Sequence, residues 1–376
     1  MPPPASTQGA RVFEEADPLV LSGGAALSEV DVVFDTYGTL DRDAGNAVLI
    51  THALTGDAHA SDWWATMVGP GKPVDTNRFF VICPNLLGGC NGTTGPRSTD
   101  PVTGRRYGLD FPILSMSDLV AVHRRLIAHL GVSRLYAAVG GSLGGMQILQ
   151  WALEAPDEIA RAVLVAASSR LTAQNIAFSA VARASITGDP DFADGQYADG
   201  AGPRQGMAVA RQMAHITYVS EENLERKFGR RFQRAESQPG FGVDFAVESY
   251  LDHQGSKFVE RFDALSYLCF TRVMDYFDPF PHSPDGIASP DRADGTDGTG
   301  SPSGAEADSA GGWPDFLVLS FTSDWRFDTR HSVRIARELV GRGARVDFRE
   351  IESPWGHDSF LFEIDGYQSA VTSFLA

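Results

Sequence analysis

Short apolar runs alternate with helix-like segments along much of the chain. Such alternation is typical of a mostly parallel β-sheet whose strands are joined by flanking helices, and it predicts an α/β fold. The segment 116–130 has apolar residues at the spacing of one helix face, and Asp118 lies in its first turn, where the helix dipole favours a carboxylate. Six apolar runs are predicted strands: 47–51, 79–83, 135–139, 162–166, 316–320 and 345–349.

The strand pattern is absent from the middle of the chain. Residues 171–280 show helical periodicity, which predicts a helical lid inserted into a core formed by residues 1–170 and 313–376. Residues 281–312 are rich in Gly, Ser, Pro and Asp and carry too few large apolar side chains to offset the entropy of ordering them. We expect a disordered acidic loop there, and frayed backbone over the Pro- and Ala-rich first ~20 residues.

Composition narrows the class of partner. The chain has 376 residues, 43% of them hydrophobic, so a large core can be buried. The net charge of −17 argues against a nucleic-acid partner and an anionic membrane surface, because both require a basic face. Only Lys72, Lys227 and Lys257 are lysines among 31 basic residues. An acidic, lysine-poor chain suits a halophilic protein, and a GC-rich genome that favours Arg codons is the alternative.

Cysteines and leader signals indicate the compartment. Cys83, Cys90 and Cys269 have no metal-ligand spacing and form no disulfide framework, so neither a metal site nor a stapled secreted protein is expected. The N-terminal segment lacks the basic and apolar regions of a secretory signal, and no apolar run reaches ~18 residues. A soluble cytoplasmic protein is the expectation.

The most informative motif is G-G-S-L-G-G at positions 140–145. It follows a predicted strand and precedes a helix-like run, which is the setting of a nucleophile elbow. A serine on so sharp a turn has strained backbone, so its neighbours must lack side chains. Ser142 is therefore the candidate nucleophile of an α/β-hydrolase fold. An ordinary glycine-rich turn would also account for this motif taken alone.

Two other residues, both closer to the C-terminus, complete a catalytic triad with Ser142. Asp324 follows the strand 316–320, and His357 lies on the loop after the last strand. This fold places its catalytic residues in the order Ser, Asp, His, each after a strand. His357 is expected to take the proton of Ser142, and Asp324 to orient the imidazole and stabilise its charged form.

An acyl-transfer site also needs donors for the developing oxyanion. The backbone N–H of Leu143 follows the nucleophile, and the N–H of Leu54 lies on the loop after an early strand. His52, which opens that loop, is expected to brace it. There is no dinucleotide fingerprint and no phosphate loop, so no cofactor is expected.

Four segments resemble homoserine O-acetyltransferases. They are H-A-L-T-G-D-A-H-A at 52–60, N-L-L-G-G-C-N-G-T-T-G-P at 85–96, the nucleophile segment 140–146, and S-P-W-G-H-D-S-F-L at 353–361. The resemblance covers about residues 15–278 and 313–376. It implies that Ser142 accepts an acetyl group from acetyl-CoA and passes it to the hydroxyl of L-homoserine, by ping-pong kinetics, in methionine biosynthesis. It also implies that a lid arginine, Arg211, and Asp358 bind substrate, and that the protein is a homodimer.

The sequence departs from that family at three places, one of which is the stretch 281–312, where the family usually has a helical part of the lid. After Asp324 it reads W-R-F-D, where the family usually has an apolar residue and a proline, so the loop there could differ in shape. Arg97 follows the second motif, where small residues are common. A basic residue near the acyl group, Arg97 or Arg211, would suit succinyl-CoA as donor. The same fold also serves enzymes that acylate L-serine, plain hydrolases and catalytically silent binding proteins, so these functions stay open beside acyl transfer to homoserine.

Overall fold

An eight-stranded sheet forms the centre of the computed structural model, which describes residues 6–234, 240–281 and 312–376. The strand order is β1-β4-β8-β5-β9-β10-β11-β12. Strand β4 is antiparallel to both its neighbours, and the other pairs are parallel. The bounds are β1 Ser6–Phe13, β4 Val30–Tyr37, β8 Phe80–Pro84, β5 Ala47–Thr51, β9 Ala137–Gly141, β10 Arg161–Val165, β11 Asp315–Phe321 and β12 Val346–Ile351. The predicted fold class, a mostly parallel sheet flanked by helices, is confirmed.

The six predicted strands correspond to β5, β8, β9, β10, β11 and β12. The largest shift is in β9, which begins two residues later than the run 135–139 suggested. Leu135 forms only an isolated bridge with Ile159, and the ladder continues through Gly140 and Gly141 to the edge where the nucleophile lies.

The expectation of frayed backbone at the N-terminus is wrong for residues 6–13. These residues form β1, which pairs with β4 over its length. Side chains add to the ladder: Thr7 donates to Asp35, and Arg11 makes a two-point hydrogen-bonded ion pair with Asp31. Because β1 is an edge strand with mostly exposed side chains, it has no apolar run for sequence reasoning to detect.

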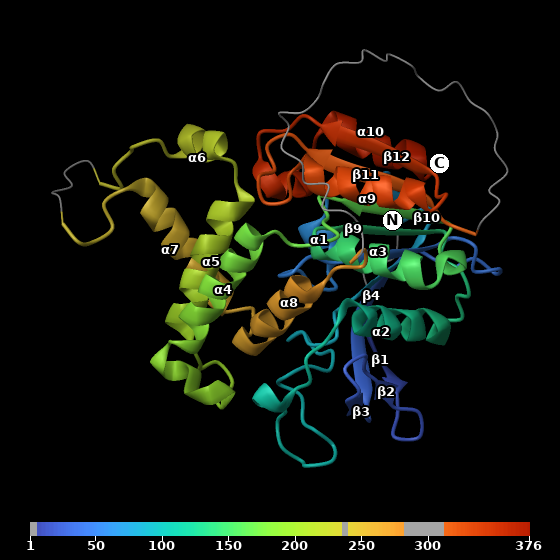
Figure 1. Cartoon of the computed structure of the whole chain (residues 1–376), viewed down its shortest axis with the longest axis horizontal. Coiled ribbons are helices and arrows are strands. Elements are labelled where there is room, and N and C mark those ends of the chain that lie inside the picture. Colours follow the sequence, from blue (N-terminus) through green and yellow to red (C-terminus); the bar gives the residue numbers. More distant parts are fainter. Residues whose placement is uncertain (1–5, 235–239, 282–311) are drawn as a thin grey trace.

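Helices cover both faces of the sheet (Figure 1). Alternate strand residues face opposite sides: Leu49 packs in the core with α2 (Met116–His129), α3 (Leu143–Glu154) and α9 (Thr329–Gly341). Its neighbour Val48 packs in the core with α1 (Ala60–Trp63) and α10 (Asp365–Phe374). Strands buried on both faces read as continuous apolar runs, which is why the sequence reveals them.

A group of helices between β10 and β11 stands to one side of the sheet (Figure 1). It comprises α4 (Ala173–Thr187), α5 (Arg204–Tyr218), α6 (Glu221–Lys227), α7 (Ala246–Val259) and α8 (Ala264–Tyr276). Helix α5 packs against both α4 and α7. This group falls within the segment 171–280 predicted to be a lid. Of the predicted acidic loop 281–312, residues 282–311 lie outside the described part of the chain.

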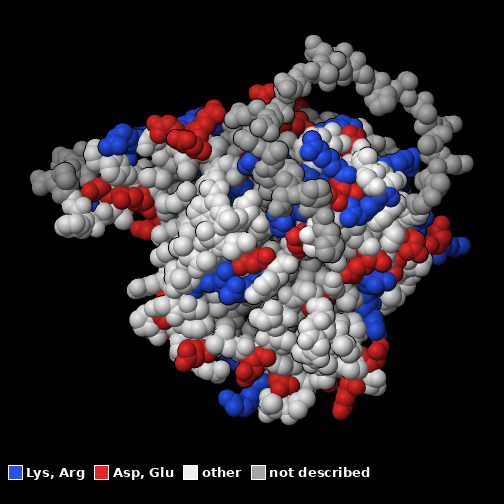
Figure 2. Space-filling view, viewed as in Figure 1, with Lys and Arg blue, Asp and Glu red and all other residues white. Residues whose placement is uncertain are grey.

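Smaller elements complete the chain. Two-stranded sheets pair β2 (Leu19–Val20) with β3 (Ala26–Leu27) and β6 (Val68–Gly69) with β7 (Val74–Asp75). Short 3-10 turns are η1 (Gly108–Asp110), η2 (Pro156–Glu158), η3 (Pro190–Gly195) and η5 (Gly356–Leu361). Acidic and basic side chains are interspersed over the face shown in Figure 2. Within the described residues, no helix combines the length and apolarity needed to cross a bilayer.

Candidate active site

Ser142 lies at the tight turn between β9 and α3. Its backbone has φ 55° and ψ −122°, a conformation that costs energy for any residue with a side chain. The surroundings leave no room for neighbours with side chains. A Cβ on Gly144 would lie 2.1 Å from the Thr51 carbonyl oxygen, and one on Gly140 would lie 2.4 Å from Thr51 Oγ1. The crowding inferred from the glycine motif is thus present on both sides of the serine.

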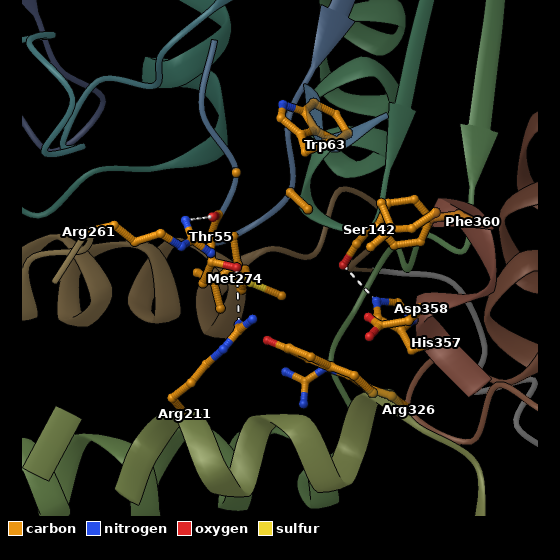
Figure 3. A pocket seen from close by; sticks show the side chains of 15 residues that line it. Thr55, Trp63, Ser142, Arg211, Arg261, Met274, Arg326, His357, Asp358 and Phe360 are labelled. Atoms are coloured by element: carbon orange, nitrogen blue, oxygen red, sulfur yellow. Dashed lines mark hydrogen bonds between the residues drawn. The ribbon is translucent and has the colours of Figure 1, made fainter. Parts of the chain in front are cut away.

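The side chains of Ser142, His357 and Asp324 form a continuous hydrogen-bonded series (Figure 3 shows the Ser142 end). His357 Nε2 lies 2.9 Å from Ser142 Oγ, and His357 Nδ1 lies 2.7 Å from Asp324 Oδ2. The other carboxylate oxygen, Oδ1, accepts from the backbone N–H groups of Arg326 and Phe327. A carboxylate fixed by two N–H groups holds the proton on Nδ1, which leaves Nε2 free to accept the serine proton.

Aromatic rings enclose the imidazole. Phe327 meets His357 edge to face with ring centroids 5.0 Å apart, and Phe360 and Tyr218 each lie 5.9 Å away. All three triad side chains are buried. Packing of this kind keeps the ring in one orientation.

The two nominated oxyanion donors lie on adjoining segments. Leu143 is the first residue of α3, and Leu54 lies on the loop after β5. The Thr51 hydroxyl donates to the Gly144 carbonyl over 2.9 Å, which holds the end of β5 against the first turn of α3. Among the residues that the structure describes, neither the Leu54 nor the Leu143 N–H donates to another group. Both are therefore available to a carbonyl oxygen bound beside Ser142.

A cavity of about 160 Å³ opens in front of Ser142 and His357. Three arginines line it: Arg211 from α5, Arg261 from the turn after α7, and Arg326 from the loop after β11. In Figure 3, Arg211 and Arg326 both reach this space. Among the described residues that line it, Asp358 is the one acidic residue. We call this space the catalytic cavity.

The side chains of the three arginines have only neutral hydrogen-bond partners in the described part of the chain. Arg211 Nη1 lies 3.3 Å from Thr55 Oγ1, and Arg261 Nη1 donates to the Thr55 carbonyl over 2.9 Å. Arg326 Nη1 donates to Thr217 Oγ1 over 2.8 Å. The guanidinium groups of Arg211 and Arg326 both lie over the ring of Tyr218, at 5.8 and 5.3 Å from its centroid. Of the three, Arg326 is buried, at 8% exposed. A buried cation without an acidic partner is costly, so this part of the cavity is suited to an anionic ligand.

Asp358 gives the cavity a single site for a cation. Burial raises the pKa of Asp358 to about 6, although His357 and Arg211 both favour its ionised form. The carboxylate is therefore largely ionised at neutral pH and able to bind an ammonium group.

Arg97, a candidate contact for the acyl donor on sequence grounds, lies elsewhere. Its guanidinium pairs with Asp263 at 3.1 Å and also with Asp199, and it does not line the catalytic cavity. Two carboxylates from the helical segment 171–280 therefore satisfy its charge. Within the described residues, His, Cys, Asp and Glu form no group of three or more that could bind a metal ion.

Sequence reasoning noticed Arg326 only as a departure from the family pattern and overlooked Arg261. The signal for Arg326 was its place two residues after the triad aspartate, and in the structure Arg326 and His357 line the same cavity. The shape of the loop after Asp324 is also defined, because Asp328 caps α9 by accepting from the Arg330 N–H.

The chain is similar to known proteins of the α/β-hydrolase fold. A family model described as the alpha/beta hydrolase fold matches residues 46–364. The homoserine O-succinyltransferase of Nocardioides sp. is 54% identical over 369 residues, covering 96% of this chain and 95% of that protein. The homoserine O-acetyltransferase of Caulobacter vibrioides is 47% identical over 374 residues, covering 97% and 94%. Among solved structures, homoserine O-acetyltransferase from Bacillus anthracis has a TM-score of 0.83 at 24% identity, covering 99% of this chain and 97% of that one. Esterase E22 has a TM-score of 0.81 at 23% identity, covering 99% and 100%.

Proposed function

Because the chain belongs to the homoserine O-acyltransferases of the α/β-hydrolase fold, we propose that it transfers a succinyl group from succinyl-CoA to the hydroxyl of L-homoserine. The observation that carries the choice of donor is Arg326, a buried guanidinium that reaches the catalytic cavity without an acidic partner in the described residues. The acetyl donor expected from sequence becomes the second candidate.

The first half-reaction acylates Ser142. Its Oγ attacks the thioester carbonyl carbon while His357 Nε2 takes the hydroxyl proton, and the N–H groups of Leu54 and Leu143 bind the oxyanion. The carbon–sulfur bond then breaks, and the CoA sulfur leaves with the proton from His357. One such oxyanion donor contributes roughly 100- to 1000-fold in rate.

The second half-reaction transfers the acyl group to homoserine. The substrate hydroxyl attacks the acyl carbon while His357 takes its proton, and the bond to Ser142 Oγ breaks as that oxygen regains the proton. In this proposal Arg211 binds the homoserine carboxylate and Asp358 its ammonium group. A planar guanidinium can hold a carboxylate through two parallel hydrogen bonds.

Charge matching favours succinyl over acetyl as the group transferred. L-Homoserine brings one carboxylate, and a succinyl group brings a second. With Arg211 paired to homoserine, the terminal succinyl carboxylate would pair with Arg326. The Arg326 backbone N–H donates to Asp324 Oδ1, which ties this residue to the triad. An acetyl group would leave that buried cation with its neutral partner Thr217 Oγ1 and no carboxylate, as in the free enzyme.

The names of the relatives bear on the choice of donor. Relatives from Nocardioides, Magnetococcus and Halothiobacillus at 54, 49 and 47% identity are named homoserine O-succinyltransferases, which supports the same donor. The Caulobacter relative at 47% supports acetyl as the second candidate. The solved esterases resemble the chain at 22–23% identity, which concerns the fold alone.

The test is a competition between donors. Purified enzyme receives L-homoserine with equal concentrations of succinyl-CoA and acetyl-CoA, and the products are identified by mass spectrometry. We expect O-succinylhomoserine to predominate and Ser142→Ala to release no CoA from either donor. Predominance of O-acetylhomoserine would contradict the donor, and CoA release with only free acid formed would show a hydrolase instead.

A further inference from the structure

A glutamine amide lies buried in the core directly behind the nucleophile. Gln147 is in α3, one turn after Leu143, and only 1% of the residue is exposed. Its neighbours on the helix, Met146 and Ile148, belong to the apolar core. A buried amide costs free energy unless every polar atom is hydrogen-bonded, so its partners indicate what it does.

The amide nitrogen of Gln147 bridges the two segments that carry the oxyanion donors. Gln147 Nε2 donates to the His52 carbonyl over 3.3 Å and to the Leu143 carbonyl over 3.1 Å. His52 lies two residues before Leu54, on the same loop. We propose that Gln147 is a positioning residue, whose amide holds the Leu54 loop against the first turn of α3 so that both N–H groups meet one oxygen. This inference rests on the proposed acyl-serine chemistry.

The orientation of the amide is fixed by its neighbours. Both groups beside Nε2 are carbonyl oxygens, which only accept, so Nε2 must be the N–H side. The opposite atom, Oε1, lies 2.8 Å from His123 Nε2, which must then donate its proton. Burial lowers the pKa of His123 to about 4, so the ring is neutral, and its Nδ1 has no hydrogen-bond partner in the part of the chain described. A single tautomer of His123 therefore fixes a single orientation of Gln147.

The loop side of the link is also uncharged. His52 Nδ1 donates to the Ala53 carbonyl over 2.8 Å, and burial lowers the pKa of His52. The connection from α2 through His123 and Gln147 to the loop thus consists of neutral hydrogen bonds in a dry region. Neutral bonds position the donors without placing a charge beside the oxyanion, where one would alter the stabilisation that Leu54 and Leu143 provide.

Separate segments need such a link because oxyanion donors act only within about 2.7–3.1 Å of the oxygen. The Thr51 hydroxyl bond to Gly144 holds the base of the loop, and Arg261 holds its far side through the Thr55 carbonyl. Gln147 contacts the stretch between them, at the His52 carbonyl two residues before Leu54. A misplacement of about 1 Å can cost roughly 100-fold in rate.

The test replaces the amide by an apolar side chain of similar length. Gln147→Met removes all three hydrogen bonds and keeps a good helix former. The matched control is Gln150→Met in the next turn of α3, whose amide nitrogen donates to Ser117 Oγ over 3.1 Å and does not contact the loop. Acylation of Ser142 is followed as the burst of nitrophenol from p-nitrophenyl acetate, which needs neither CoA nor homoserine. KM for homoserine and inhibition by a small alkylboronic acid, which forms a tetrahedral adduct on serine, are measured in parallel.

We expect the burst rate of Gln147→Met to fall roughly 10- to 100-fold, boronic acid inhibition to weaken in step, and KM for homoserine to stay within about twofold. Gln150→Met should resemble the wild type. Gln147→Glu is the second variant, because a carboxyl group of the same shape cannot donate to two carbonyls, and it should acylate slowly as well. A soluble variant at position 147 with a wild-type burst, or with only a raised KM, overturns the proposal. Absence of a burst from the wild type, together with no adduct on Ser142 from succinyl-CoA, would instead refute the acyl-serine chemistry.

Discussion

Replacement of Arg326 by methionine should change which acyl donor the enzyme prefers. Arg326 is 8% exposed, and within residues 6–234, 240–281 and 312–376 its guanidinium has one side-chain hydrogen bond, to Thr217 Oγ1. Methionine keeps an unbranched apolar stem beside Tyr218 and Phe327, where the guanidinium now lies. The lost Thr217 bond is worth about 1 kcal/mol, and removal of a buried cation without an acidic partner offsets it. The melting temperature should therefore change little.

The effect on succinyl transfer follows from the bonds that Arg326 would make to the donor. Two hydrogen bonds between a guanidinium and a carboxylate contribute roughly 1.5–3 kcal/mol each, and competing solvation reduces the net loss to about 3–4 kcal/mol. At 1.36 kcal/mol per factor of ten, kcat/KM for succinyl-CoA should fall roughly 10²- to 10³-fold. For acetyl-CoA, which has no second carboxylate, kcat/KM should stay within about threefold or rise.

The assay measures thioester loss at saturating L-homoserine for each donor separately. Arg261→Met is the matched control, since Arg261 lines the same cavity but donates to the Thr55 carbonyl, and it should affect both donors by a similar factor. An equal fall for both donors in Arg326→Met would refute the reasoning, because Arg326 would then not contact the acyl carboxylate.

Three other perturbations test separate parts of the structure. KM for homoserine should rise as pH falls through about 6, where Asp358 gains a proton. Asp358→Asn should raise KM roughly 10-fold or more at higher pH and abolish the pH dependence. A pH dependence that persists in this variant would contradict the role of Asp358. Gly144→Ala places a Cβ 2.1 Å from the Thr51 carbonyl oxygen, so the free energy of unfolding should fall by about 3 kcal/mol or more. The loss should appear as a lower soluble yield or a lower melting temperature. An unchanged melting temperature would contradict the crowding at Gly144. The hydrogen bond to Asp35 raises the pKa of His59 above its usual value. This pair therefore stabilises the fold fully below about pH 6.5 and less as pH rises through the folded pKa. Melting temperature against pH should flatten in His59→Gln, and an identical profile would exclude the pair as a contributor.

Much of the fold and the triad could be predicted because their signals are local in sequence. Strands buried on both faces appear as unbroken apolar runs, as at 47–51 and 316–320, and catalytic side chains of this fold follow such strands. Ser142, Asp324 and His357 could therefore be located before any distance was known. The antiparallel edge strand β1 could not, because its side chains are mostly exposed and its stability comes from pairing with β4.

The charges of the catalytic cavity were less accessible to sequence reasoning because they depend on contacts between distant segments. Arg326 is turned towards the cavity by Thr217 and Tyr218, which lie on α5 more than a hundred residues earlier. Arg97 directly follows the motif 85–96 in sequence, yet its guanidinium pairs with Asp263, more than a hundred residues later. Which arginines remain unpaired is a property of the folded chain, and it decides the proposed donor.

The most direct test of the account is the intact mass of the enzyme after brief exposure to succinyl-CoA without homoserine. We predict an increase by one succinyl group, located on the peptide that contains Ser142, absent in Ser142→Ala and removed on addition of L-homoserine. Acetyl-CoA should leave far less adduct under the same conditions. An acetyl adduct without a succinyl adduct would contradict the donor, and no adduct on Ser142 from either would contradict the acyl-serine route itself.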